Sequence, residues 1–171
     1  MFVRICAAAI LSSISAGAAW SQDQATASVG FVDAEGMENG TAEISATASG
    51  GVLVRMEVTG LPAGEWVAVH FHETGTCDHT TKHESAGGHF NPGSKEHGFN
   101  AASGPHAGDM PNQYVGSDGA VRAEIFNSMV TLDDGESSVK GRALMVHAKA
   151  DDYKSQPSGN AGDRLACGAI Q

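Results

Sequence analysis

Short strand-like segments separated by turns constrain the fold of this chain more than any other feature. Residues 52–58 read Val-Leu-Val-Arg-Met-Glu-Val, and a period of two places the apolar residues on one face of a strand. Further strand-like runs, at 25–32, 41–47, 66–72, 121–126 and 143–147, are separated by glycine and acidic turn residues. Beyond residue 21 the sequence shows no convincing helical period. This pattern predicts an all-β domain, an antiparallel sandwich or barrel.

The first 21 residues have the pattern of a secretory signal. A short positive start, Met1 to Arg4, precedes an apolar run over 5–18, and Ala19-Trp20-Ser21 offers small residues where a signal peptidase cuts. The apolar run is shorter than the roughly 20 residues that a bilayer-spanning helix needs. We therefore expect no membrane anchor but a single domain over 22–171, released to the periplasm or secreted.

The charge of the expected mature domain argues against nucleic acid as a partner. Only Arg4 of the 10 Lys and Arg residues lies in the signal, so 9 basic residues remain against 20 acidic ones, a net charge of −11. Phosphate backbones require a basic face.

Two cysteines remain after the signal, Cys77 and Cys167. In an oxidising compartment they are expected to form one disulfide, although two unrelated buried thiols also fit the sequence.

Between residues 70 and 109, a set of ligand-type side chains stands in short glycine-rich motifs: His70, His72, His89, His97, His106 and Asp109. Imidazole suits copper and zinc, and a carboxylate completes zinc sites. His70 and His72 lie two apart on an expected strand and so project from one face. His147 ends another expected strand and can converge on them. The stretch from 73 to 111 lacks strand periodicity, as functional loops often do. The sequence therefore predicts a metal centre.

With these motifs the chain resembles the copper/zinc superoxide dismutases in their secreted bacterial form. The resemblance is carried by residues 70–73 (His-Phe-His-Glu), 87–92 (Gly-Gly-His-Phe-Asn-Pro), 95–98 (Lys-Glu-His-Gly), 106–112, 146–152 and 159–168. It covers essentially the whole chain after the signal. It implies an eight-stranded antiparallel Greek-key β-barrel, of Ig-like sandwich architecture, with two long functional loops.

The resemblance also implies one copper and one zinc per chain, superoxide as substrate, and a role for each motif residue. Copper would be held by His70, His72, His89 and His147, and zinc by His89, His97, His106 and Asp109. The His89 imidazolate would bridge the two metals and accept a proton as copper is reduced. Asp151 would hydrogen-bond one ligand of each metal, Arg164 would orient the anion, and Cys77 would pair with Cys167.

A non-catalytic copper-binding or copper-delivery domain on the same fold is the alternative, since a fold does not guarantee an activity. The complete copper set and Arg164 favour the enzyme. His79 and His83 have no counterpart among the expected ligands, and we expect both to be exposed loop residues. Lys149 and Lys154 are expected to be solvated loop charges. A homodimer is possible, but the sequence shows no decisive interface.

Overall fold

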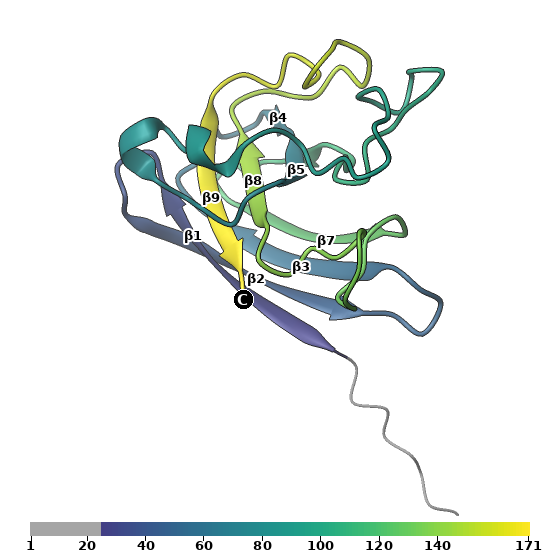
Figure 1. Ribbon diagram of the computed structural model, residues 1–171. Coiled ribbons are helices and arrows are strands. Elements are labelled where there is room, and N and C mark those ends of the chain that lie inside the picture. The colour runs from purple at the N-terminus through teal and green to yellow at the C-terminus, as the bar shows by residue number, and fades with distance from the viewer. Residues whose placement is uncertain (1–24) are drawn as a thin grey trace, which may run out of the picture.

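The computed structural model describes residues 25–171, so the expected signal over 1–21 lies outside the described residues (Figure 1). Nine β-strands occur in this range: β1 Thr26–Asp33, β2 Glu38–Ala46, β3 Val52–Val58, β4 Trp66–Val67, β5 Val69–His72, β6 Gln113–Tyr114, β7 Val121–Asn127, β8 Ala143–His147 and β9 Arg164–Ile170. Two single 3-10 turns, η1 His79–Thr81 and η2 Glu84–Ala86, are the helical elements of the described part, which contains no α-helix. The all-β prediction is confirmed.

Seven of the strands form one curled antiparallel sheet in the order β5-β8-β9-β1-β2-β3-β7, and β4 pairs with β6 (Figure 1). The strand expected at 52–58 coincides with β3, which buries Val52, Val54, Met56 and Val58. The run expected at 66–72 is interrupted at Ala68, between β4 and β5. The sequence pattern does not predict strand β9, because the centre of this strand reads Ala-Cys-Gly-Ala, small residues with no clear alternation.

The apolar side chains on the concave side of the sheet form a single core. It includes Val29, Phe31, Ile44, Val54, Val58, Val69, Phe71, Ile125, Leu144 and Val146. A smaller cluster, Ala86, Ala143, Met145 and Cys167, lies on the opposite side of β8 and β9. On β5 and β8 the core residues are Val69, Phe71, Leu144 and Val146. Neighbouring residues of a strand point to opposite faces. The alternate residues of both strands therefore face outward.

Two long loops cover this outward face, residues 73–112 between β5 and β6 and residues 148–163 between β8 and β9 (Figure 1). The Cys77–Cys167 disulfide joins the first loop to β9, as expected. No helix within residues 25–171 has the length and apolar character needed to cross a membrane.

Candidate metal centre

The strand register places three of the predicted ligands on one face. His70 and His72 are alternate residues of β5, and the backbone N–H of His147 donates to the Ala68 carbonyl at 2.9 Å. Residues directly opposite on paired strands share a face, so His147 projects on the same side as His70 and His72. The register between β8 and β9 shifts between Val146 and His147. A bulge of this kind re-aims the side chain that follows it.

The first loop adds the remaining ligand candidates by pairing with the free edge of β5. Isolated bridges set His89 opposite His72 and Asp109 opposite His70. The backbone N–H of Phe71 donates to the Gly108 carbonyl at 2.9 Å, which seats the loop against the strand.

Two groups of buried side chains result. The four-histidine group consists of His70, His72, His89 and His147, and the aspartate group consists of His89, His97, His106 and Asp109. Within each group the potential ligand atoms all lie within 4.8 Å of one another. In the four-histidine group, the Nε2 atoms of His72 and His147 are 3.3 Å apart. His89 belongs to both groups and joins them into one centre.

Asp109 is the hub of the aspartate group. Its Oδ1 atom lies 2.9 Å from His89 Nδ1, 3.1 Å from His97 Nδ1 and 3.5 Å from His106 Nδ1. Its Oδ2 atom accepts hydrogen bonds from the backbone N–H groups of Gly98, at 2.8 Å, and His106, at 3.0 Å. Burial alone would raise the pKa of Asp109, but the hydrogen bonds from the surrounding imidazoles outweigh it and hold the pKa well below its usual range.

The donor atoms fit the expected metals. Among the described residues, the buried atoms His70 Nδ1 and His89 Nε2 have no hydrogen-bond partner, an arrangement that costs free energy unless a ligand uses them. Four imidazoles form a set that copper accepts, and three imidazoles with one carboxylate form a closed zinc set.

Burial keeps the four-histidine group neutral. It lowers the pKa of His70, His72, His89 and His147, that of His89 to about 4. A neutral imidazole offers a nitrogen lone pair to a metal. His97 differs: burial lowers its pKa, but hydrogen bonds to Asp109 and Asp151 outweigh burial and raise the pKa to about 9.

Asp151 connects the two groups through a single carboxylate. Its Oδ2 lies 2.9 Å from His70 Nε2 and its Oδ1 lies 2.9 Å from His97 Nε2. Such outer contacts fix the ring orientation of metal ligands. Asn112, which sequence reasoning did not single out, holds Asp151 in turn: its Nδ2 donates to the Asp151 carbonyl at 2.9 Å and its Oδ1 accepts from the Asp151 N–H at 2.8 Å. Gly159 has a φ of +67°, and a Cβ there would collide with the Asp151 carboxylate.

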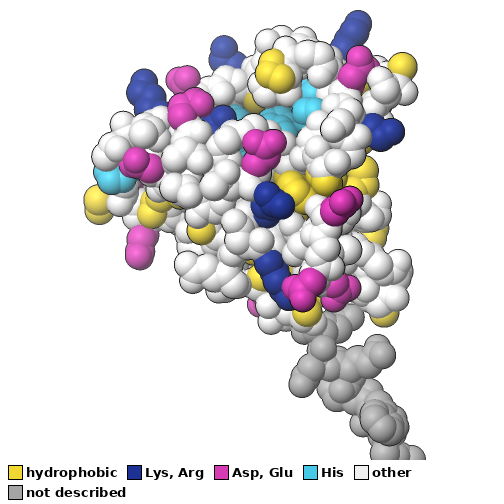
Figure 2. Space-filling view, in the orientation of Figure 1, with side chains coloured by type: hydrophobic (Ala, Val, Ile, Leu, Met, Phe, Trp, Pro, Cys, Tyr) yellow, Lys and Arg dark blue, Asp and Glu magenta, His cyan; other side chains and the backbone are white. Residues whose placement is uncertain are grey.

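A cleft of about 940 Å³ gives access to the centre. Its lining includes His72, His89, His147 and Arg164, and Figure 2 shows histidine side chains in a hollow beside the two loops. Lys82 and Lys95 also line it. Lys149 and Lys154 do not line the cleft and are exposed, as expected.

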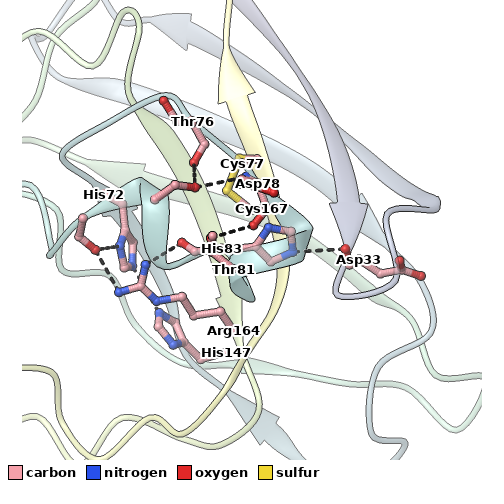
Figure 3. The surroundings of a disulfide bond; sticks show 12 residues. Asp33, His72, Thr76, Cys77, Asp78, Thr81, His83, His147, Arg164 and Cys167 are labelled. Atoms are coloured by element: carbon pink, nitrogen blue, oxygen red, sulfur yellow. Dashed lines mark hydrogen bonds between the residues drawn. A yellow bond between two sulfur atoms is a disulfide. The ribbon is translucent and has the colours of Figure 1, made fainter.

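Arg164 is held at the cleft by backbone carbonyls. Its Nη1 donates to the His83 carbonyl at 2.7 Å and its Nη2 to the Gly87 carbonyl at 2.8 Å (Figure 3). The exposure expected for His83 is wrong, because its side chain is fully buried, whereas His79 is exposed as expected. Left-handed backbone at Lys82 and His83, which no local pattern indicates, turns the ring inward.

Comparison with known proteins gives a consistent result. The family model described as copper/zinc superoxide dismutase (SODC) matches residues 38–170. The chain is 46% identical over 158 residues to superoxide dismutase [Cu-Zn] 2 of Aquifex aeolicus, covering 90% of this chain and 91% of that protein.

Solved structures agree with the sequence relatives. A superoxide dismutase-like (SOD-like) protein from Bacillus subtilis superposes with a TM-score of 0.81 at 38% identity, over 84% of this chain and 97% of that one. The Cu/Zn superoxide dismutase from Brucella abortus superposes with a TM-score of 0.71 at 29% identity, over 86% and 100% of the two chains.

Proposed function

This chain belongs to the copper/zinc superoxide dismutase family, and on that premise we propose how its own residues serve the reaction. The protein is an oxidoreductase that converts superoxide to dioxygen and hydrogen peroxide, with copper and zinc as cofactors. The observation that carries the residue assignment is that two complete ligand groups share His89 beneath a cleft lined by Arg164.

The four-histidine group would hold one copper per chain, and the aspartate group would hold one zinc. An all-imidazole set suits copper, whereas the added Asp109 carboxylate suits zinc. When bound, copper supplies the one-electron redox change and zinc supplies a fixed positive charge without redox chemistry. Asp151 keeps His70 and His97 oriented for the two ions.

Arg164 attracts and orients the substrate. Superoxide carries one negative charge, and a guanidinium recognises small anions by charge and hydrogen bonding. The group lies beside His72 and His147 (Figure 3). On a domain with a net charge of −11, such a local positive charge is needed to draw an anion into the cleft.

His89 supplies the proton. Its Nδ1 lies against Asp109, while its Nε2 belongs to the four-histidine group and has no hydrogen-bond partner in the described structure. Nε2 therefore takes up a proton and passes it to the oxygen anion as that anion is reduced. In balance, two superoxide anions and two protons give one dioxygen and one hydrogen peroxide.

A copper carrier on the same fold is not favoured. Delivery requires release of the metal and has no use for an anion-binding arginine, a second buried ligand group or a shared histidine. All three features occur together around the cleft.

Replacing Arg164 with alanine tests this assignment. Reconstituted wild-type and variant proteins should each contain one copper and one zinc, and the variant should dismute superoxide about tenfold more slowly at low salt because steering is lost. Metals are measured by mass spectrometry and rates by pulse radiolysis. Arg55→Ala is the matched control, since it removes the same charge from an exposed position on β3. Equal rates for wild type and Arg164→Ala, with both metals retained, would refute the role; a single occupied site in wild type would refute the two-metal assignment.

We propose that the strands form an eight-stranded Greek-key barrel in which β4 and β5 count as one strand. They are separated only by Ala68, whose N–H donates to the Lys149 carbonyl at 2.9 Å. Strand β6 pairs with β4 and contacts β7, so it would close the barrel between the two ends of the large sheet. A crystal structure in which β6 contacts neither neighbour would contradict this closure.

We also propose that a second copy of the chain docks on the β4–β6 sheet. Trp66 and Tyr114 are about half exposed there, and their rings pack edge to face at 5.4 Å, a pairing typical of interfaces. Trp66→Ser with Tyr114→Ser should convert dimer to monomer in sedimentation velocity, while Met37→Ser, exposed in the β1–β2 turn, should not. A monomeric wild type at high micromolar concentration would reject the proposal.

The mature domain is proposed to span 22–171 and to act in the periplasm or outside the cell. The signal-like first 21 residues and the Cys77–Cys167 disulfide support this, since disulfides persist in oxidising compartments. N-terminal sequencing of the native protein should begin at Gln22; a chain beginning at Met1 would contradict export by cleavage.

A further inference from the structure

His83 is a fully buried histidine that belongs to neither ligand group. Its Nε2 atom lies 3.1 Å from the backbone carbonyl of Asp33, and its Nδ1 atom has no partner in the described structure. The carbonyl can only accept, so Nε2 carries the hydrogen and donates. Burial lowers the pKa of His83, which keeps the imidazole neutral with this one N–H. Burying an imidazole with one of its two nitrogen atoms unpaired costs free energy.

The contact connects the first loop to the strand beside Arg164. Asp33 is the last residue of β1 and pairs with Ala166 of β9, two residues beyond Arg164. The ring of His83 therefore docks the loop on β1, next to the strand that carries the arginine (Figure 3).

The backbone of His83 is turned to meet Arg164. Lys82 and His83 both have left-handed φ angles, 51° and 61°, a conformation that is strained for residues other than glycine. The turn directs the His83 carbonyl at Arg164 Nη1, 2.7 Å away. One residue thus holds β1 with its ring and the guanidinium with its carbonyl.

Residues 83–87, which we term the arginine bracket, hold the guanidinium at both ends. The Gly87 carbonyl accepts from Arg164 Nη2 at 2.8 Å and also lies 3.0 Å from His72 Nδ1. The disulfide fixes the loop at Cys77, six residues before His83. The Ser85 hydroxyl, which donates to the Thr76 carbonyl at 2.8 Å, also holds the bracket, and the His83 ring provides its contact with β1.

We propose that His83 is a positioning residue: its ring, anchored on the Asp33 carbonyl, fixes the arginine bracket and thereby the orientation of the Arg164 guanidinium toward a small anion in the cleft. His83 acts through Arg164 and does not touch the substrate. The proposal rests on the anion-binding role given above to Arg164.

Variants of His83 that keep or remove the N–H donor test the proposal. Phenylalanine fills a similar space without a donor; glutamine extends an amide N–H toward the Asp33 carbonyl, and asparagine is one methylene too short. The readout is the affinity of the copper- and zinc-loaded protein for azide, a small anion that binds copper, followed by visible absorption. His83→Phe and His83→Asn should weaken azide binding about threefold through misplacement of the guanidinium. His83→Gln should restore it, and His79→Phe, an exposed change on the same loop, should have no effect.

A double variant separates positioning from mere stability. If His83 acts through Arg164, His83→Phe should add nothing to the loss of azide affinity caused by Arg164→Ala. Additive losses, or wild-type affinity in His83→Phe, would overturn the proposal even if urea unfolding shows lowered stability. Should the phenylalanine variant fail to fold, equal affinities for the glutamine and asparagine variants would overturn it. If Arg164→Ala itself leaves azide affinity unchanged, the role proposed above for the arginine fails instead.

Discussion

Replacing Cys77 and Cys167 with alanine is expected to lower the free energy of unfolding of the metal-free protein by about 4 kcal/mol. The bond spans 90 residues of sequence, and a cross-link over a loop of that size removes much of the entropy of the unfolded chain. Cys167 is fully buried beside Met145 and Ala143, so the variant also leaves a small void. Urea denaturation followed by circular dichroism measures the difference.

Reduction of the wild-type protein provides the matched control. A phosphine reductant should reproduce most of the loss in wild type and change nothing in the double variant. The first loop, which carries all four members of the aspartate group beyond Cys77, should then release zinc faster to a chelator. A loss below 1 kcal/mol, with unchanged zinc release, would mean that contacts such as His83 with Asp33 hold the loop without the covalent bond.

The fold was predictable where each strand has its own alternating pattern. Residues 52–58 gave β3 with its true bounds, because one face packs on the core and the other meets water. Strands β5 and β8 are buried on both faces, since the loops cover their outer sides. The sequence of β8 therefore lacks alternation. The shared face of His70 and His72 was predictable from their spacing, but its position opposite the core followed from register, which only the structure supplies.

The residues that could bind metal were predictable from the sequence, whereas the contacts that hold the site residues in place were less so. Ligand-type side chains are recognisable by residue type and motif, and the structure brings all seven together into two groups that share His89; which ion each group holds stays a prediction. The supports depend on backbone carbonyls and long-range contacts. The burial of His83 follows from two left-handed residues and a carbonyl on β1, and no local sequence pattern encodes that contact.

Acidification should destabilise the metal-free protein strongly between pH 6.5 and pH 4. Burial lowers the pKa of His70, His72, His89 and His147 in the folded chain, whereas an unfolded histidine titrates near 6.5. As pH falls, the unfolded state binds protons first, so stability is present above about 6.5 and is lost toward the folded pKa values. For His89 alone, with a folded pKa of about 4, the loss is about 3 kcal/mol once pH is below that value.

His97 changes the stability with pH in the opposite direction, so the pH profile distinguishes it from the other four histidines. Its pKa is raised to about 9, so its stabilisation is complete below about 6.5 and is lost as pH rises through 9. Asp109 and Asp151, whose pKa values are lowered, lose their contributions to stability only below about pH 3.9, outside the pH range in which the histidines titrate.

Urea unfolding of metal-free protein from pH 4 to pH 9.5 should therefore give maximal stability near neutrality. His97→Gln should flatten the alkaline limb and leave the acid limb. Copper and zinc should shift the acid limb to lower pH, because protons then compete with the ions for the same nitrogens. Constant stability of the metal-free protein between pH 7 and pH 4 would contradict burial of four neutral imidazoles in one centre.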